Sequence, residues 1–414
     1  MPDVIDTLRE RGFVAQISEE DRLRERLAKG PVTLYAGYDP TAPSLTAGHL
    51  VSVMMLAHFQ RAGHRPIVVV GGGTGMVGDP TGKTEMRQLL SLEQIDANIA
   101  GLRQQFGRYL DFAGDRALIV NNADWLLRLG YVEFLRDIGR HFTVNQLLQH
   151  STYRERVAGD GLSFIEFNYA LLQAYDFLHL YRKYGCTLQV GGQDQWFNIL
   201  SGAELIRRVA GGDAFALVSP LLMTAAGEKM GKTAAGAVWL DPARTSPYDY
   251  YQFWINTADA DVSRFLALFT FMPMDDIRRL TARDGAELRE AKEVLALEAT
   301  TLTHGQREAE GAREASRALF DHEGAYGGGA AASAPTTTIL GVRLAEGIEL
   351  VDLLVETGLA GSKRAARDLV RQGGISVNGE RIDDANARID QGWPRDGSIL
   401  LRAGKKRFHR VIVE

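Results

Sequence analysis

The chain reads Val32-Thr33-Leu34-Tyr35 near its beginning, a short apolar run with the β-branched and aromatic residues of a buried strand. The turn Asp39-Pro40 follows, and then Ser44-Leu45-Thr46-Ala47-Gly48-His49, where a glycine-bearing loop meets an apolar helix. Much later the chain reads Lys229-Met230-Gly231-Lys232-Thr233. An imidazole at a helix start and two amines spaced by a flexible glycine can hold a triphosphate from two sides. We therefore expect a nucleotide site after the first strand, although the lysines alone would also fit an exposed basic turn.

Further strand-like runs alternate with amphipathic helical stretches. They lie at residues 67–70 and 118–120, and the alternation predicts a parallel sheet covered by helices, that is, a Rossmann-like α/β domain. Ligands of such sheets bind at the carboxyl ends of the strands. Residues 36–40 and 71–79 fall at those ends, so the singled-out segments are expected to share one edge of the sheet.

The length of 414 residues exceeds one typical core, so we expect about two or three domains. Strand signals disappear from Pro247 to about Ala318, which indicates a helical domain. Residues 327–335 are small and uncharged, the composition of a linker. We predict a catalytic domain at 1–235, an α-helical domain at 236–325, a flexible linker at 326–345 and a small α+β domain at 346–414.

Charge is distributed unevenly along the chain. Residues 361–414 contain 12 Lys or Arg and 7 Asp or Glu, whereas the whole chain carries a net charge of -5. A basic tail on an acidic body favours polyanion binding by the tail, with a solvated charged surface as the alternative. The acidic start and the absence of a long apolar run lead us to expect a cytoplasmic location. The lone Cys186 excludes an intramolecular disulfide and a Cys-rich metal site.

A glycine-rich segment follows the second predicted strand. Residues 73–78 match the dinucleotide fingerprint, which also requires an acidic residue about 20 positions later. The next apolar run ends instead at Asn121-Asn122, more than twice as far away. Residues 78–84 resemble a phosphate-binding P-loop but have three residues between the glycines where four are required. Glycines that serve a tight turn, or that let the backbone approach a ligand, are the remaining alternative.

A second polar cluster is predicted on a helix. Residues 167–177 form an apolar stretch that carries Tyr169, Gln173 and Asp176 at i, i+4 and i+7, so the three side chains share one face. Buried polar groups need partners. The stripe therefore borders either a ligand cavity or a hydrogen-bonded core network. Gly191-Gly192-Gln193-Asp194-Gln195-Trp196 adds polar residues on glycines that permit close approach.

These segments resemble the class I aminoacyl-tRNA synthetases. The histidine and lysine segments are similar to the two signatures of that class, and Tyr35-Ala36-Gly37-Tyr38-Asp39-Pro40-Thr41 together with the polar helix resembles its bacterial tyrosyl branch over nearly the whole chain. The resemblance implies activation of L-tyrosine by ATP to tyrosyl-adenylate and pyrophosphate, and then transfer to the 3' end of tRNA(Tyr). The tryptophanyl branch shares the fold class, but it lacks a paired site for a phenol and normally a basic C-terminal module.

The resemblance also implies roles for the matching residues. The phenolic hydroxyl of tyrosine would be bound by Tyr35 and Asp176. Its ammonium group would lie near Asp79, Tyr169 and Gln173, with Gln195 also in contact with the amino acid or its adenylate. ATP and the adenylate would be bound by Gly37, Asp39, Thr41, Thr46, Gly48, His49, Gly192, Asp194 and Lys232. Charge moving towards pyrophosphate would be stabilised by His49, Lys83, Arg87, Lys229, Lys232 and Thr233.

The implied chemistry is in-line attack of the tyrosine carboxylate on the α-phosphate, which needs no general base because the carboxylate is already ionised. Mg²⁺ would accompany the ATP phosphates, without a dedicated protein site. One residue departs from the family pattern: Thr46 stands where a histidine is usual, and a hydroxyl can donate a hydrogen bond but carries no charge.

The tail resembles the S4 RNA-binding module. Ser362 is a candidate N-cap of a helix, and Gly374-Ile375-Ser376-Val377-Asn378-Gly379-Glu380 predicts a strand followed by an Asn-Gly turn. The expected RNA contacts are Lys363, Arg364, Arg367, Arg371, Lys405, Lys406, Arg407 and Arg410. tRNA(Tyr) is the expected partner, and a homodimer is implied by resemblance. An NAD-dependent dehydrogenase and a noncatalytic RNA-binding protein related to a synthetase are the competing hypotheses.

Overall fold

The computed structural model describes residues 3–81, 91–149, 151–159, 161–225, 227, 230–233, 236–282, 286–321, 335–395, 397–404 and 407–414. Its contacts divide the chain into two units. Unit 1 comprises Met1–Asp241 and Thr257–Leu295, and unit 2 comprises Pro242–Asn256 and Ala296–Glu414. Within the described ranges, every helix is too short or too polar to cross a membrane.

A sheet of six described strands forms the centre of unit 1, in the order β1-β6-β5-β2-β3-β4. All neighbours pair in parallel except β1, which runs antiparallel to β6 at the edge. The predicted runs at 32–35, 67–70 and 118–120 correspond to β2, β3 and β4, so the expected parallel sheet is confirmed. The strands are β1 (Gln16–Ile17), β2 (Thr33–Tyr38), β3 (Arg65–Val70), β4 (Leu118–Asn121), β5 (Cys186–Gly192) and β6 (Phe215–Ser219).

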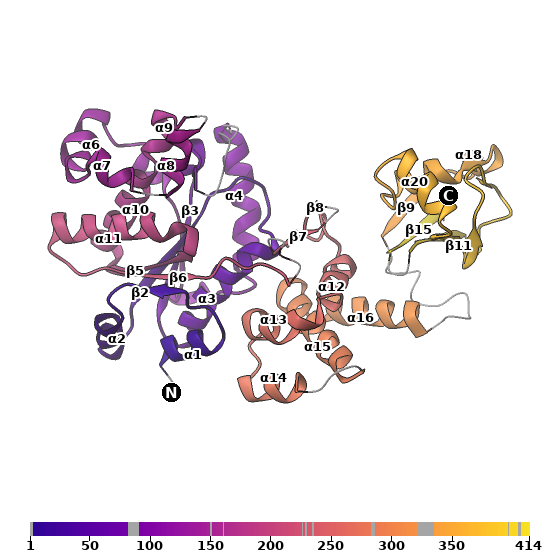
Figure 1. Cartoon of the computed structure of the whole chain (residues 1–414), viewed down its shortest axis with the longest axis horizontal. Coiled ribbons are helices and arrows are strands. Elements are labelled where there is room, and N and C mark those ends of the chain that lie inside the picture. Colours follow the sequence, from indigo (N-terminus) through magenta and orange to yellow (C-terminus); the bar gives the residue numbers. More distant parts are fainter. Residues whose placement is uncertain are drawn as a thin grey trace. The chain divides into compact units, whose positions relative to one another are not determined.

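Helices cover both faces of this sheet (Figure 1). On one face lie α10 (Tyr169–Tyr184) and α11 (Trp196–Ala210), and Phe177 of α10 packs in one core with Tyr35 and Ile67. On the other face lies α3 (Leu50–Arg61), which is buried along most of its surface and is accordingly apolar on nearly every side. α10 ends at Gly185, whose φ of 63° is the left-handed conformation that glycine adopts at a helix C-terminus. α4 (Leu92–Phe106) begins with a capping box of Ser91 and Gln94.

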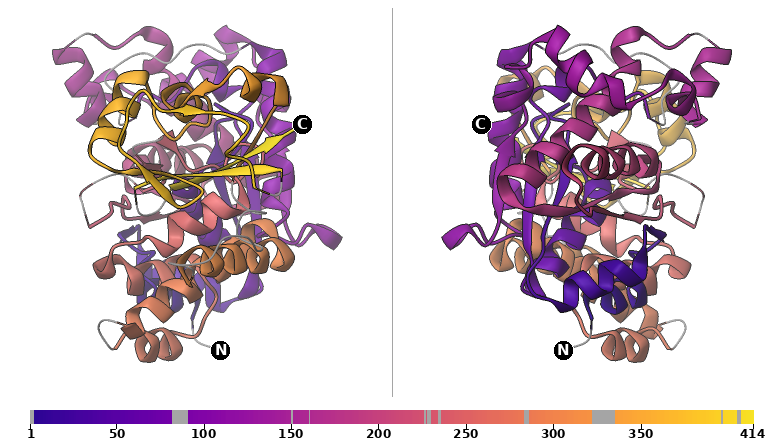
Figure 2. Two further views of the ribbon diagram at one scale, coloured as in Figure 1. Left: turned by 90° about the vertical axis from the view of Figure 1, so that its right-hand side faces the viewer. Right: turned by 90° about the vertical axis from the view of Figure 1, so that its left-hand side faces the viewer.

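Short helices connect β4 to α10, and Figure 2 shows them gathered together, in magenta. A buried ion pair joins two of them, because both terminal nitrogens of Arg156 donate to the Glu166 carboxylate at 3.1 Å. Large apolar side chains nevertheless stay exposed here, among them Tyr131, Val132 and Phe164. The helices are α5 (Ala123–Leu126), α6 (Tyr131–Asp137), α7 (Val144–Leu147), α8 (Ser151–Ala158) and α9 (Phe164–Phe167).

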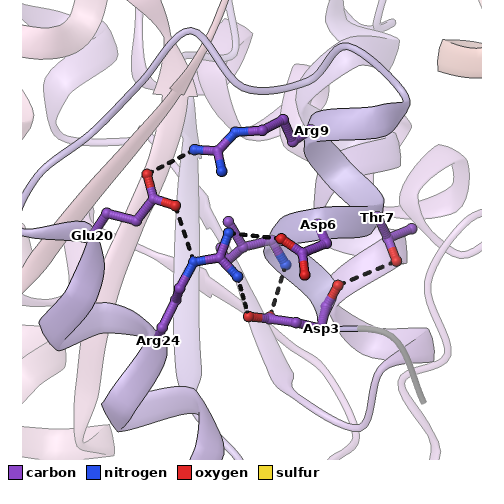
Figure 3. A network of polar contacts seen from close by, with 7 residues as sticks. Asp3, Asp6, Thr7, Arg9, Glu20 and Arg24 are labelled. Atoms are coloured by element: carbon purple, nitrogen blue, oxygen red, sulfur yellow. Dashed lines mark hydrogen bonds and ion pairs between the residues drawn. The ribbon is translucent and has the colours of Figure 1, made fainter.

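A polar network ties α1 (Val4–Glu10) to α2 (Glu20–Ala28), as Figure 3 shows. Arg24 donates to Asp6 at 2.8 Å and to Glu20 at 3.0 Å, and it also contacts Asp3, whose side chain caps α1. Arg9 donates to the same Glu20 at 2.7 Å. An exposed ion pair contributes at most about 1 kcal/mol. It is the sharing of one guanidinium among three carboxylates that fixes the first helix to the second.

Helices dominate from Pro247 to Asp321, as expected. α12 (Pro247–Ile255) begins at an N-cap, Ser246, and packs on α16 (Gln306–Asp321), where Gln252 donates to Ser316 at 2.9 Å. The intervening helices are α13 (Val262–Phe269), α14 (Met274–Leu280) and α15 (Ala286–His304). The contacts group residues 257–295 with the sheet of unit 1. A separate helical domain at 236–325 therefore stays a prediction.

The tail forms a sheet of five described strands in the order β12-β11-β14-β15-β9, packed with α19 and α20 around one apolar core. Ser362 caps α20 by accepting the Ala365 N–H at 3.2 Å, and the Asn378-Gly379 turn joins β11 to β12 with positive φ at both residues. The expected linker at 326–345 differs from the structure in its second half, because Thr336–Ile339 forms β9 and pairs with β15. The elements are β9 (Thr336–Ile339), α18 (Gly341–Ala345), β10 (Ile348–Glu349), α19 (Leu350–Glu356), α20 (Lys363–Arg371), β11 (Ile375–Val377), β12 (Glu380–Ile382), β13 (Arg388–Ile389), β14 (Ser398–Ala403) and β15 (Arg407–Val413).

Candidate active site

The polar segments of unit 1 meet at the carboxyl ends of its parallel strands. Asp39 follows β2 and accepts a hydrogen bond from Thr74 Oγ1 at 2.8 Å, and Thr74 belongs to the glycine segment after β3. A Cβ at Gly71 would lie 2.2 Å from Asp39 Oδ1, so only glycine allows this approach. The Gly73 N–H donates to Asn122 Oδ1 at 2.7 Å, just after β4. These contacts place the glycine segment in close packing between the ends of β2, β3 and β4.

Asp176 of α10 lies at the centre of a buried hydrogen-bond network. Its side chain is 4% exposed, Trp125 Nε1 donates to Oδ1 at 2.7 Å, and Asn122 Nδ2 donates to Oδ2 at 2.9 Å. Burial raises the pKa of the Asp176 carboxyl to about 7, although these two hydrogen bonds lower it. Each carboxylate oxygen has one protein donor, and each can accept a further hydrogen bond.

Tyr35 lies on β2 close enough to Asp176 for the two charges to interact. Its ring packs edge-on against Phe177, with the centroids 5.2 Å apart. Burial, followed by the charge of Asp176, raises the pKa of the Tyr35 phenol well above its ordinary range, so the group keeps its proton. The Tyr35 hydroxyl is buried and has no hydrogen-bond partner among the described residues. Such an orphan donor is costly unless a ligand or a water satisfies it.

A second carboxylate cluster surrounds the start of α10. Tyr169 donates to Asp39 Oδ2 at 3.0 Å, and Gln195 Nε2 donates to Asp79 Oδ2 at 2.7 Å. Burial first, and then the charges of Asp39 and Asp79, raise the pKa of the Tyr169 phenol well above its ordinary range. Gln173 is half-buried on the same helix. Burial disfavours any isolated charge, but the nearby Asp39 and Asp79 carboxylates would stabilise a cation such as an ammonium group here.

The two signature segments lie against each other, although they are far apart in the sequence. The Ala47 N–H donates to Val238 O at 2.9 Å, and the Val238 N–H donates to Gly231 O at 2.9 Å. A Cβ at Gly231, where φ is 83°, would lie 2.5 Å from Gly48 N, and a Cβ at Gly48 would lie 2.9 Å from Met230 O. We call this backbone packing of Met230-Gly231 on Ala47-Gly48 the signature contact.

His49 is exposed at the start of α3, and Thr46 fixes its ring. The Thr46 N–H donates to His49 Nδ1 at 3.0 Å, and the Thr46 hydroxyl lies 3.0 Å from the same nitrogen. Because Nδ1 accepts a hydrogen bond, the neutral ring carries its proton on Nε2. Nε2–H is the kind of donor that a phosphate oxygen requires. Position 46, where the resemblance led us to expect a histidine, thus holds a threonine that orients the ring of His49.

Several candidate residues have less structural description. Lys83, Arg87 and Lys229 lie outside the described residues, as do Lys405 and Lys406 of the tail. Lys232 and Thr233 form β7 (Lys232–Thr233), which pairs with β8 (Gly236–Ala237), and only their backbone is described.

The remaining candidates have definite places. Gly37 is exposed within β2, and Thr41 is exposed in the segment that follows the strand. A Cβ at Gly192 would lie 2.5 Å from Asp194 Oδ1, so any larger residue there would displace the Asp194 side chain. Of the RNA contacts expected in the tail, Lys363, Arg364, Arg367, Arg371 and Arg407 are exposed, and Arg410 is half-buried. Lys363 pairs with Asp352 of α19 at 2.6 Å, so part of its charge is neutralised within the protein.

The sequence interpretation missed Asn122, Trp125 and Thr74. Asn122 bonds to both Asp176 and Thr74, and Trp125 bonds to Asp176. Asn121-Asn122 was noted only as an end of a strand that lacks an acidic residue. Its place after the third predicted strand was the available signal, because the carboxyl ends of parallel strands share one edge. Within the described residues, no group of three or more His, Cys, Asp or Glu side chains is arranged to hold a metal ion.

Two models of known protein families match the chain. The family model for class I tRNA synthetases (W and Y) matches residues 27–321. The chain belongs to this family. A second model, the tyrosine-tRNA ligase SYY-like C-terminal domain, matches residues 330–411. The first model thus covers β2 to β6 of the unit 1 sheet and the helices that follow it, and the second covers nearly all of the tail.

Full-length relatives of this class I synthetase are named tyrosine-tRNA ligase. One from Desulfatibacillum aliphaticivorans is 53% identical, with 99% of both chains covered. One from Clostridium tetani is 50% identical, with 100% of this chain and 99% of the relative covered. A C-terminally truncated mitochondrial tyrosyl-tRNA synthetase from Aspergillus nidulans aligns with a TM-score of 0.70 and 32% identity, over 77% of this chain and 95% of that one.

Proposed function

We propose that this synthetase is a tyrosine-tRNA ligase, which activates L-tyrosine with ATP and transfers it to tRNA(Tyr). The observation that carries the proposal is the buried pair of Asp176 and Tyr35, a charged acceptor beside an orphan hydroxyl, in a chain whose full-length relatives carry that name. A phenolic hydroxyl can donate to Asp176 and accept from Tyr35 at the same time. Phenylalanine would leave the Tyr35 hydroxyl without a partner and would offer no donor to Asp176, which is the physical basis for its rejection.

The remaining side chains suit the other parts of the substrates. We assign the tyrosine ammonium group to Asp79, Tyr169 and Gln173, where the carboxylates of Asp39 and Asp79 offset the cost of burying a cation. Gln195 and Asp194 are assigned to the carboxylate and ribose region, and Asp39 with the exposed Gly37 and Thr41 to the nucleotide. The segment around Gly192 lets its backbone approach the adenylate. Bound in this way, the tyrosine carboxylate and the α-phosphate are held in an orientation for in-line attack.

Charge that moves towards pyrophosphate is assigned to the signature residues. His49 supplies an Nε2–H donor held by Thr46, and the lysine segment supplies Lys229, Lys232 and Thr233. Lys83 and Arg87 are assigned to the same leaving group. Mg²⁺ is proposed to arrive with the ATP phosphates and to lower their charge.

The tail is proposed to bind tRNA. The α20 residues Lys363, Arg364, Arg367 and Arg371 are all exposed, while Ala366 and Val370 of the same helix are buried in the tail core. Cations presented in this way neutralise phosphates, and the affinity should fall steeply with salt. Lys405, Lys406 and Arg407 are assigned to the same surface. A homodimer in the cytoplasm completes the proposal, and the exposed apolar side chains of α6 to α9 support an association surface.

The decisive experiment is exchange of labelled pyrophosphate into ATP. We expect exchange that depends on tyrosine and is not supported by phenylalanine or tryptophan. Exchange driven by tryptophan would assign the chain to the other branch of the family, and no exchange would favour a noncatalytic RNA-binding protein.

A truncated chain tests the tail. The cut follows Asp321, because β9 belongs to the tail sheet. We expect this chain to retain exchange and to lose tRNA charging. Normal charging by the truncated chain would contradict the role of the tail.

A further inference from the structure

The residues that precede the lysine segment are hydrogen-bonded to two side chains at the start of α13 that belong to neither signature. We define the leading arm as residues 222–225, which precede the lysine segment. Asp261 is the residue before α13, and it is 3% exposed. Its Oδ2 accepts the Ala225 N–H at 2.7 Å. A buried carboxylate thus binds the backbone of the leading arm directly.

Arg264, one turn further along α13, completes this attachment. Its Nη2 donates to Met223 O at 2.6 Å and also bonds to Asp261 Oδ1. The guanidinium lies over the Phe265 ring, 5.3 Å from its centroid, which restricts its orientation. The pair is electrically neutral, so Asp261 is not left as an unpaired buried charge, and it places no net negative charge close to the phosphates of ATP.

The leading arm is in turn bonded to the signature contact. Leu222 O accepts the Met230 N–H at 2.9 Å, and Met230 is the residue whose carbonyl oxygen lies against Gly48. A continuous series of contacts therefore runs from Asp261 and Arg264, through residues 222–225, to Met230-Gly231 and the loop before His49.

α13 itself is fixed at its other end. Arg11 is 6% exposed and donates to Ala267 O at 2.8 Å, to Thr270 O at 2.9 Å and to Met272 O, so it caps the C-terminal carbonyls of α13. α13 also packs on α3, the helix that begins after His49. α13 thus packs on the helix that follows the histidine segment, and Asp261 and Arg264 at its start bond to the leading arm that precedes the lysine segment.

We propose that Asp261 and Arg264 are positioning residues for adenylate formation, because they hold the leading arm so that the lysine segment meets the histidine segment. They act through the backbone of Met223 and Ala225 and touch neither tyrosine nor the phenol-binding side chains. The inference rests on the proposed function, since it concerns the rate of tyrosine activation. It assigns to this class I chain a structural element outside both signatures.

The test uses the full-length chain and separates activation from tyrosine binding. Asp261→Asn and Arg264→Ala are expected to lower the single-turnover rate of adenylate formation about tenfold, while the tyrosine dissociation constant stays within about twofold of the wild type. Arg264→Lys keeps a cationic donor and should restore part of the rate. Ser263→Ala changes an exposed neighbour on the same helix and should leave both quantities unchanged. Equal loss of rate and of tyrosine affinity would overturn the inference.

A double-mutant cycle with Lys232→Ala excludes a merely structural effect. If Asp261 acts through the lysine segment, Asp261→Asn should slow the Lys232→Ala enzyme much less than it slows the wild type. Independent, multiplicative losses would refute the proposal. Two results separate this inference from the proposed function. If the wild-type chain shows no tyrosine-dependent exchange, the proposed function is refuted. If the Asp261→Asn enzyme shows normal exchange, only the positioning role is refuted.

Discussion

The phenol end of the proposed site, which comprises Tyr35, Asn122, Trp125 and Asp176, differs in construction from the signature contact. At the phenol end, buried side chains bond to one another, and Asp176 is 4% exposed. At the signature contact, backbone atoms hold the two segments together, and His49 is exposed. Fixed side chains in a dry environment discriminate between ligands, whereas backbone contacts between loops let charged side chains adapt to moving phosphates. Substitutions at the two places should therefore affect different kinetic quantities.

Replacing Asp176 should have the largest effect. Asp176→Asn removes the charged acceptor for the phenol, so we expect the preference for tyrosine over phenylalanine to fall by about a hundredfold or more. The ratio of kcat/KM values for pyrophosphate exchange with the two amino acids measures this. Asp124→Asn, at an exposed neighbour of Trp125, is the matched control and should leave the ratio unchanged. An unchanged ratio in Asp176→Asn would contradict the assignment.

Adding one methyl group to the signature contact should slow activation and spare selection. Gly231→Ala places a Cβ 2.5 Å from Gly48 N and imposes a positive φ on alanine, so we expect adenylate formation to slow by about thirtyfold. Gly211→Ala is the control, because Gly211 has a φ of 61° but its Cβ would meet nothing within 4 Å. It should lower the free energy of unfolding by about 1 kcal/mol and leave activation normal. Equal slowing by both variants would remove the contact from the mechanism.

Tyr35→Phe separates binding from stability at the phenol end. The hydroxyl has no protein partner among the described residues, so its removal should leave the free energy of unfolding unchanged or slightly higher. Tyrosine affinity should fall about tenfold, as measured by equilibrium dialysis. Tyr250→Phe is a useful contrast, because the Tyr250 hydroxyl accepts a hydrogen bond from Thr303 at 3.0 Å and its loss should cost about 1 kcal/mol of stability. Undiminished tyrosine affinity in Tyr35→Phe would refute the assignment.

The pKa of Asp176 predicts a pH dependence of tyrosine binding. Burial raises this pKa from 3.8 to about 7, so the folded protein holds the proton more tightly than the unfolded chain. The stabilisation that results is complete below about pH 4 and is lost as the pH rises through about 7. Tyrosine requires the ionised form as acceptor, so its affinity should rise about tenfold between about pH 6 and pH 8. In Asp176→Asn this dependence should vanish, and its persistence would point to another group.

Thr46 should show the smallest effect. Thr46→Val removes the hydroxyl but keeps the backbone N–H that donates to His49 Nδ1, so we expect activation to slow only about threefold. Thr46→Ser should behave as the wild type. A loss comparable to that of Gly231→Ala would mean that the hydroxyl contacts the nucleotide itself.

The sequence predicted those parts of the molecule that depend on local patterns. β3 is a continuous apolar run, α10 carries its polar stripe at helical spacing, and the Asn378-Gly379 turn adopts the positive φ values that its residues favour. The family and the tyrosine-tRNA ligase assignment, expected from the two signatures, agree with the comparisons. β6 was not singled out, although Phe215-Ala216-Leu217-Val218 is as apolar as β2.

What the sequence did not predict depends on contacts between distant residues. Asn122 and Trp125 meet Asp176 across 54 and 51 positions, and only the order of the strands brings them together. The attachment of Ala225 to Asp261 likewise follows from the packing of α13 and from no periodicity. β9 is a short polar run of threonines, and it pairs as a strand with β15, which lies about 70 residues further along the chain.

Gly48 and Gly231 also bear on how this enzyme can change over generations. At both positions the opposing backbone leaves no space for a methyl group. Since the residue at the other position is already glycine, no smaller residue there could make room for a larger one. These two positions, 183 residues apart in the sequence, are therefore constrained together. A redesign of nucleotide binding in this protein has to start from other residues.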